Sequence, residues 1–212
     1  MSQSSFGNKF KVTTWGESHG KALGAVIDGC PAGLPLCEED IQKFLDRRKP
    51  GQSRYTTARK EGDLVEILSG VFEGKTTGTP ISLMVRNTDQ RSRDYGNIAY
   101  SYRPGHADYT FDQKYGFRDY RGGGRSSGRE TIGRVAAGAI ASKILEELGI
   151  SICTYTRSIG PVEIASFNKE EIHQNAFYMP DAQAAVKAGE YLEECMKNQD
   201  SAGGVIECRI TG

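Results

Sequence analysis

Three consecutive glycines at positions 122–124 lead directly into a stretch with the signature of a long helix. Ser127 and Glu130 have the spacing of a capping box, and apolar residues then recur at helical intervals from 132 to 148. Gly149 follows, at a position where glycine commonly ends a helix. Any fold of this chain must therefore accommodate a capped helix that begins beside a very open backbone turn.

The start of this helix also carries Arg125, Arg129 and Arg134. A helix N-terminus behaves like about half a positive charge, so each cation there costs roughly 0.3–1 kcal/mol. Three arginines are reasonable at this place if an anion binds among them, together with backbone N–H groups and the hydroxyls of Ser126 and Ser127. The sequence therefore predicts a cradle for a phosphorylated ligand.

Two other interpretations of this tract remain open. Arg-Gly-Gly runs also occur in flexible RNA-binding tails, and arginines on a helix surface are often only solvated. An RNA-binding tail, however, would lack the capped helix with its apolar stripe. The tract also matches neither the G-x-x-x-x-G-K-[ST] nor the G-x-G-x-x-G phosphate motif.

The arginines are concentrated in one part of a neutral chain. Thirteen of the fifteen lie between Arg47 and Arg134, with four lysines and ten acidic residues, so this stretch carries +7 while the whole chain carries zero. A local excess of arginine favours a focused anion pocket over a nucleic-acid surface, which usually makes a whole domain basic. We therefore expect no nucleic-acid partner.

The sequence also indicates the cellular compartment of the protein and whether it binds a metal. The apolar runs are too short to span a membrane and the N-terminus shows no secretory signal, so we expect no membrane partner. Five widely spaced cysteines argue for reduced thiols in the cytoplasm and against disulfides or a zinc site. We expect no metal.

The remaining pattern is a mixture of hairpins and helices, which predicts an α+β fold. Strands are expected near 10–14, 22–28, 64–68, 81–85, 152–159 and 204–210, and helices at 38–48, 127–148 and 181–197. Residues 86–125 show no periodicity, which is typical of a functional or disordered segment. We expect residues 1–212 to form a single domain of a truncated polypeptide, with its last strand unpartnered.

Candidate acid groups are few. His19 and His106 lie in glycine-flanked turns that a ligand can approach closely, whereas His173 lies in an ordinary polar segment and is expected at the surface. Arg48 and Arg54 flank a Pro-Gly turn and have the chemistry to grip phosphate or carboxylate. Structural histidines and solvated arginines are the alternatives. The residues thus indicate an anion-binding enzyme with one or two acid histidines.

Several strings resemble the chorismate synthase family. Gly-Glu-Ser-His-Gly at 16–20 and Gly-Gly-Gly-Arg-Ser-Ser-Gly-Arg-Glu-Thr at 122–131 are similar to its two signatures, and segments 46–48, 53–55, 87–92 and 103–108 resemble those it carries between them. The resemblance covers nearly all of this chain but only the N-terminal part of the family. The family's C-terminal arginine–aspartate signature and a later flavin-site segment are absent from this sequence.

The resemblance implies a carbon–oxygen lyase of the shikimate pathway. It would eliminate phosphate from 5-enolpyruvylshikimate 3-phosphate to give chorismate, with reduced FMN as the cofactor and NADPH as a reductant in some members. The implied fold is a layered α+β sandwich with helices between antiparallel sheets, and the full-length protein would be a homotetramer. A catalytically inactive phosphate- or flavin-binding fragment is the alternative function.

The resemblance also implies a role for each candidate residue. His106 would protonate or hydrogen-bond the reduced flavin, and His19 would protonate the departing phosphate. The other residues would hold ligands. The substrate would be bound by Ser18, Arg48, Arg54, Arg103 and Arg129, and FMN by Arg125, Ser126 and Ser127. NADPH would also be bound by Arg48 and Arg54.

Overall fold

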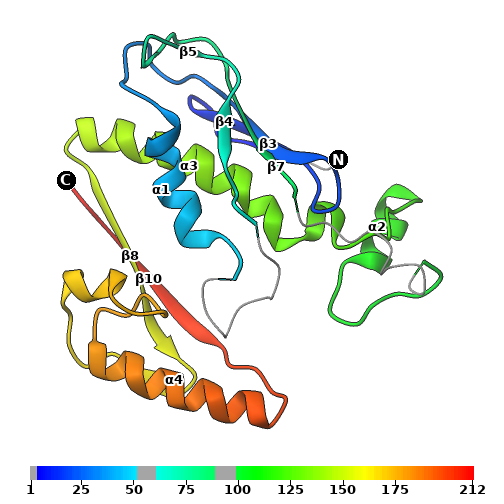
Figure 1. Ribbon diagram of the computed structural model, residues 1–212, viewed down its shortest axis with the longest axis vertical. Coiled ribbons are helices and arrows are strands. Elements are labelled where there is room, and N and C mark those ends of the chain that lie inside the picture. Colours follow the sequence, from blue (N-terminus) through cyan, green and yellow to red (C-terminus); the bar gives the residue numbers. More distant parts are fainter. Residues whose placement is uncertain (1–3, 52–60, 89–98) are drawn as a thin grey trace. The chain divides into compact units, whose positions relative to one another are not determined.

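The computed structural model describes residues 4–51, 61–88 and 99–212 (Figure 1). The chain divides into two compact units, the first holding the described residues up to 144 and the second residues 145–212. Arg54 lies outside the described residues. Antiparallel sheets and helices occur together, which confirms the α+β class. A single domain over residues 1–212 stays a prediction.

The first unit is built on a five-stranded antiparallel sheet. Its strands, in spatial order, are β1 (Ser5–Phe6), β2 (Lys11–Gly16), β3 (Ala22–Asp28), β7 (Ile81–Arg86) and β4 (Val65–Ile67). A small hairpin of β5 (Val71–Phe72) and β6 (Lys75–Thr76) accompanies it. The four strands expected in this part of the sequence are confirmed: 22–28 matches β3 at both ends, and the ends of the others differ by at most two residues.

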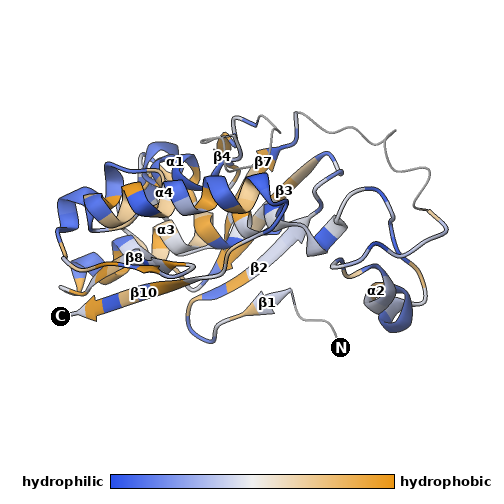
Figure 2. Ribbon diagram, turned by 90° about the horizontal axis from the view of Figure 1, so that it is seen from below, coloured by the Kyte–Doolittle hydropathy of each residue, from blue (hydrophilic) through white to orange (hydrophobic). Residues whose placement is uncertain are grey.

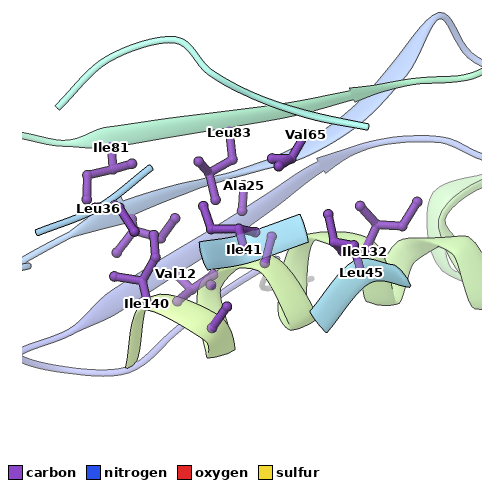
Figure 3. Packing of buried hydrophobic residues seen from close by; sticks show 14 of the residues in the cluster. Val12, Ala25, Leu36, Ile41, Leu45, Val65, Ile81, Leu83, Ile132 and Ile140 are labelled. Atoms are coloured by element: carbon purple, nitrogen blue, oxygen red, sulfur yellow. The ribbon is translucent and has the colours of Figure 1, made fainter. Parts of the chain in front are cut away.

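Two helices share one hydrophobic core with this sheet. Ile41 and Leu45 of α1 (Glu38–Arg48) and Ile132 and Ile140 of α3 (Thr131–Glu147) are buried in the same cluster as the inward residues of the strands (Figure 3). Alternation along a strand puts every second side chain on one face, which supplies Leu23, Ala25 and Ile27 from β3. Burying each large apolar side chain contributes about 1.5–3 kcal/mol.

One glycine allows α3 to pack closely on the sheet. A Cβ atom at Gly133 would lie 2.7 Å from the carbonyl oxygen of Gly24 and 3.0 Å from the Thr14 methyl group. A larger residue would push the helix away from β2 and β3. The close approach explains glycine at a helical position where it costs roughly 0.5–1 kcal/mol relative to alanine.

The start of α3 differs from the predicted capping box. The α-helix begins at Thr131, after two 3₁₀ turns, Gly124–Ser126 and Gly128–Glu130. Ser127 does cap the second turn, since its Oγ accepts the Arg129 N–H at 3.3 Å. The reciprocal bond from Glu130 was a wrong prediction, because its carboxylate instead accepts the hydroxyl of Thr14 at 2.6 Å.

A helix also lies within the stretch expected to be irregular. Residues Asp108–Tyr115 form α2, which ends at Gly116 with a left-handed φ of 71°. Residues 89–98 of the same stretch lie outside the described residues. The prediction that 86–125 lacks regular structure is therefore wrong over α2, whose weak apolar pattern gave no helical signal.

The second unit pairs a three-stranded antiparallel sheet with one long helix. The strand order is β10 (Gly204–Thr211), β8 (Ser151–Ile159) and β9 (Val162–Glu163). Helix α4 (Ala182–Lys197) mixes hydrophobic and hydrophilic residues (Figure 2), and its small buried residues pack around Met179. A 3₁₀ turn, Lys169–His173, carries the exposed His173, so its predicted surface position is confirmed.

The last strand is paired, contrary to expectation. β10 bonds to β8 along its whole length, from Gly204 opposite Ile159 to Thr211 opposite Ser151. Apolar side chains of this strand are nevertheless exposed, since Ile206 and Ile210 are each about two-thirds exposed. In the described parts of the chain, no helix is long and apolar enough to cross a bilayer.

Candidate functional site

The histidine turn, residues 16–20, folds against the glycine run although more than a hundred residues separate them. The turn connects β2 to β3, and the N–H of Ser18 donates to the carbonyl of Gly124 at 3.5 Å. The His19 ring lies directly over Gly122, where an added Cβ would be 2.0 Å from Nδ1, and Gly122 has a left-handed φ of 64°. Glycine is thus required at 122 both for its backbone and for the space it leaves.

The His19 ring is oriented by its neighbour. The Oγ of Ser18 lies 3.0 Å from Nδ1 of His19, and Ser18 is 1% exposed. The carboxylate of Asp119 interacts with the same ring at longer range. The pKa of Asp119 is lowered chiefly by its hydrogen bond from Arg121, with His19 contributing. A buried hydroxyl therefore contacts the ring, and the charge of a nearby carboxylate acts on it.

Arg103 connects the second histidine to this glycine run. Its Nε and Nη2 bind the Asp108 carboxylate at 2.9 and 2.7 Å, and Nη2 also donates to the carbonyl of Gly122 at 2.7 Å. These bonds hold the pKa of Asp108 well below its usual range. The carbonyl of Arg103 accepts the N–H of His106 at 3.2 Å, and His106 is exposed just before α2. Contacts through Arg103 and Gly122 therefore link both histidine turns.

The arginines at the start of α3 have protein partners that the sequence did not indicate. Arg125 donates to the carbonyl of Gly16 at 2.9 Å and to Oγ1 of Thr14 at 2.7 Å. Arg125 and Arg134 also pair with Glu130, at 3.3 and 2.9 Å. One carboxylate thus compensates two of the three arginines, and the binding of an external anion among them stays a prediction. Arg125 also holds the end of β2 through its bonds to Thr14 and Gly16.

Arg129 is the arginine that the protein buries. It is 6% exposed, and Oδ1 of Asn87 accepts its Nε and Nη2 at 3.1 and 2.9 Å. Its Nη1 lies 2.9 Å from Oδ1 of Asp63, without the alignment of a hydrogen bond, and its Nη2 lies 3.9 Å from Oε1 of Glu61. Both acidic side chains are fully buried. A buried arginine is tolerated only when it is paired in this way.

Arg48 belongs to the same group. Its Nη1 lies 3.1 Å from Oδ2 of Asp63, so one carboxylate bridges Arg48 and Arg129. Burial lowers the pKa of Arg48, and the charge of Asp63 opposes that shift. We call Arg48, Glu61, Asp63 and Arg129 the charge cluster. The sequence pointed to its arginines and gave no signal for its two acids.

The two predicted serines lie on the outer side of the glycine run. Ser126 is exposed and its Oγ donates to the carbonyl of Gly123 at 2.6 Å, while Ser127 is half-buried. A pocket opens beside them, with two phenylalanine rings and several polar groups in its wall. Its lining residues are Glu17, Ala107, Asp108, Phe111, Phe117, Arg118, Asp119, Gly122, Gly123, Gly124, Arg125 and Ser126.

The structure thus gathers most of the predicted site residues into connected groups within the first unit. His19, Ser18, Arg103 and His106 connect through Gly122, while Arg48 and Arg129 meet in the charge cluster. Asn87 belongs to the segment 87–92 that the sequence had marked, but its role was missed. Among the described residues, no group of three or more His, Cys, Asp or Glu side chains could hold a metal ion. The absence of a metal stays a prediction.

Comparison with known proteins points to one family. A family model described as chorismate synthase matches residues 10–212. The chorismate synthases of Agathobacter rectalis and Lachnoclostridium phytofermentans are 71% and 67% identical over the whole chain, which covers 58% of each. A solved structure titled "Crystal Structure of Chorismate Synthase" superposes with a TM-score of 0.75 at 34% identity, over 96% of this chain and 58% of that one. The chain therefore spans about 58% of the length of these relatives.

Proposed function

This chain belongs to the chorismate synthase family, and from that premise we propose that the whole protein converts 5-enolpyruvylshikimate 3-phosphate to chorismate. The reaction is a 1,4-elimination, in which the substrate loses one proton and its phosphate group. The protein is accordingly a carbon–oxygen lyase of aromatic amino-acid biosynthesis. The observation that carries the proposal is the linkage of both histidine turns through Arg103 and Gly122, beside a helix start that includes a buried arginine.

The arginines and His19 act on the leaving group. As the carbon–oxygen bond breaks, its electrons depart with the phosphate oxygen, and a nearby positive charge lowers the energy of that state. Arg129 and Arg48 hold the anionic substrate, with Arg54 and Arg103 as further contacts and Ser18 at the histidine turn. His19 donates a proton to the departing phosphate, which general acid catalysis favours near neutral pH.

Reduced FMN is the cofactor in this proposal, and the pocket beside the glycine run fits such a group. Phe111 and Phe117 offer apolar surface for a flat ring, while Ser126 and the glycine backbone offer polar contacts at the other side. Ser127 and Arg125 complete the proposed FMN contacts. Bound reduced FMN supplies the electron-rich partner that the elimination requires, although the reaction has no net redox change. His106 hydrogen-bonds or protonates the flavin from its exposed turn before α2.

Several finer properties belong to the same proposal. NADPH is a reductant of the flavin, bound through Arg48 and Arg54. The full-length protein is a cytoplasmic homotetramer, with a small-molecule substrate and without nucleic-acid or membrane partners. Each is an attribute of the family that this chain resembles.

A binding module without catalysis is the second candidate, and an RNA-binding protein the third. The match to an enzyme family over residues 10–212 favours catalysis. The ion pairs of Arg103, Arg125 and Arg129 within the protein disfavour an arginine-rich RNA surface. Absorbance of the purified protein separates the classes: flavin bands are expected, and a nucleic-acid peak would favour RNA binding. Phosphate release from the enolpyruvyl substrate with pre-reduced FMN then separates an enzyme from a binding module, which would release none.

A further inference from the structure

One side chain joins the histidine turn to Arg129. Asn87 follows the end of β7, and its Nδ2 donates to the carbonyl of Glu17 at 2.9 Å and to that of Gly20 at 2.7 Å. Its Oδ1 accepts both Nε and Nη2 of Arg129, at 3.1 and 2.9 Å. The NH₂ group of the Asn87 amide therefore binds the histidine turn, while its carbonyl oxygen binds Arg129.

The two carbonyls that Asn87 holds lie on either side of the reactive pair. Glu17 and Gly20 flank Ser18 and His19, so the amide binds both ends of the turn that carries the acid. The backbone N–H of Asn87 adds a third bond, to the carbonyl of Lys21 at 3.1 Å. The turn is thus fixed to the end of β7 at three points.

The other side of the amide fixes the arginine. Arg129 is 6% exposed, and its guanidinium donates two hydrogen bonds to Oδ1 of Asn87. These two bonds restrain the rotation of the guanidinium. A carboxamide is rigid, so the distance between its nitrogen and its oxygen does not change. The position of the His19 turn and that of the Arg129 guanidinium are consequently set by one small rigid group.

We propose that Asn87 is a positioning residue, which sets where His19 stands relative to Arg129 during the elimination. The inference rests on the proposed function, since it assumes that His19 supplies a proton while Arg129 holds the substrate. Asn87 itself makes no contact with the reacting atoms in this account. A misplacement of about 1 Å can cost about 10²-fold in rate, so a loss of this size is expected in kcat.

The variant that isolates this role is Asn87→Asp. The carboxylate keeps an oxygen for Arg129 but replaces the donating NH₂ with an oxygen that repels the carbonyls of Glu17 and Gly20. Asn87→Ala is the second variant, which removes the amide without adding a charge. Asn175→Asp is the matched control, because Nδ2 of Asn175 also donates to two carbonyls, those of Glu171 and Met179, both at 2.8 Å in the second unit.

The first readout is the NMR spectrum of the three histidines during a pH titration, with His19 assigned from His19→Gln. In both Asn87 variants the signals of His19 should move and its titration midpoint should change, while those of His106 and His173 stay. In Asn175→Asp the signals of His19 and His106 should stay, while His173, two residues from the new carboxylate, is left out of this comparison. This readout needs no turnover, so a wild type that makes no chorismate would count against the proposed function and not against the positioning of His19.

The second readout is steady-state kinetics with pre-reduced FMN, using protein expressed from its complete reading frame. Both Asn87 variants should lose about 10²-fold in kcat with a smaller change in KM, while Asn175→Asp keeps its kcat. Folded Asn87 variants with unchanged His19 signals and unchanged kcat would overturn the proposal. A rise in KM alone would overturn it as well, since that would make Asn87 a substrate-binding group.

Discussion

The hydroxyl of Ser18 lies 3.0 Å from Nδ1 of His19, and both residues belong to a turn that is packed on the glycine run. Ser18 is almost completely buried, so its hydroxyl is held in place by the surrounding backbone. A hydroxyl bonded to one ring nitrogen restrains the orientation of the imidazole. In this structure the buried serine therefore orients the histidine, and its contact with the substrate stays a prediction.

Replacing Ser18 with alanine separates these two roles. We expect kcat to fall by about 2- to 10-fold with KM nearly unchanged, because the net value of one hydrogen bond is about 0.5–1.5 kcal/mol. The measurement is steady-state turnover with pre-reduced FMN. A raised KM with an unchanged kcat would instead favour direct binding of the substrate by Ser18.

Both histidine turns are expected to be essential. His19→Ala and His106→Ala should each lower turnover by about 10²–10⁴, the usual range for a lost acid–base group. Circular dichroism serves as the control for folding. If both variants are folded and turn over at nearly the wild-type rate, the proposed acid roles are wrong.

The charge cluster should contribute strongly to stability. Asp63→Ala leaves Arg48 and Arg129 without the carboxylate between them, and removing one partner of a buried ion pair costs about 3–5 kcal/mol. Urea denaturation measures the free energy of unfolding. The matched control is Glu66→Ala, which breaks the exposed pair with Arg86 and should cost less than about 1 kcal/mol. Equal losses in the two variants would show that Asp63 is not buried as described.

Asp181 should make the stability of the second unit depend on pH. Its carboxylate accepts the N–H groups of Ala184, Ala165 and Ser166, which lower its pKa to about 2, and it also accepts the N–H of Gln183. A lowered pKa means that the stabilisation is complete above the ordinary value of 3.8 and is lost as the pH falls toward about 2. Asp181→Ala should cost about 0.5–2 kcal/mol at pH 7.

The pH dependence of the difference between Asp181→Ala and wild type provides the check. Urea denaturation at a series of pH values should show this difference shrinking between pH 4 and 2. A difference that is the same at neutral and at acid pH would mean that the lost cap, and not the carboxylate charge, accounts for the effect.

The local features of this fold were readable from the sequence. Alternating apolar residues predicted the strands of the first sheet, and Asp181 was correctly placed at the start of α4. Those signals arise from neighbours in the chain. Helix α2 escaped prediction because its weak apolar pattern gave no helical signal, although the bonds between Arg103 and Asp108 hold its first turn.

Contacts between distant residues could not be read in the same way. Glu130 has the spacing of a capping residue, yet Thr14, 116 positions away, takes its carboxylate. Asn87 meets Glu17 across 70 positions and Arg129 across 42. Such partners are decided by which strands and turns become neighbours in space, and a local pattern contains no information about that. The family resemblance marked the segment 87–92 without saying what Asn87 does.

Product formation under anaerobic conditions is the decisive test of the proposed elimination. Protein expressed from its complete reading frame is mixed with 5-enolpyruvylshikimate 3-phosphate and pre-reduced FMN, and chorismate and phosphate are measured in the same samples. Equal amounts of the two products are expected with reduced FMN and none with oxidised FMN, and His19→Ala should lower the rate by about 10²–10⁴. Folded wild-type protein that binds reduced FMN but forms no chorismate would contradict it.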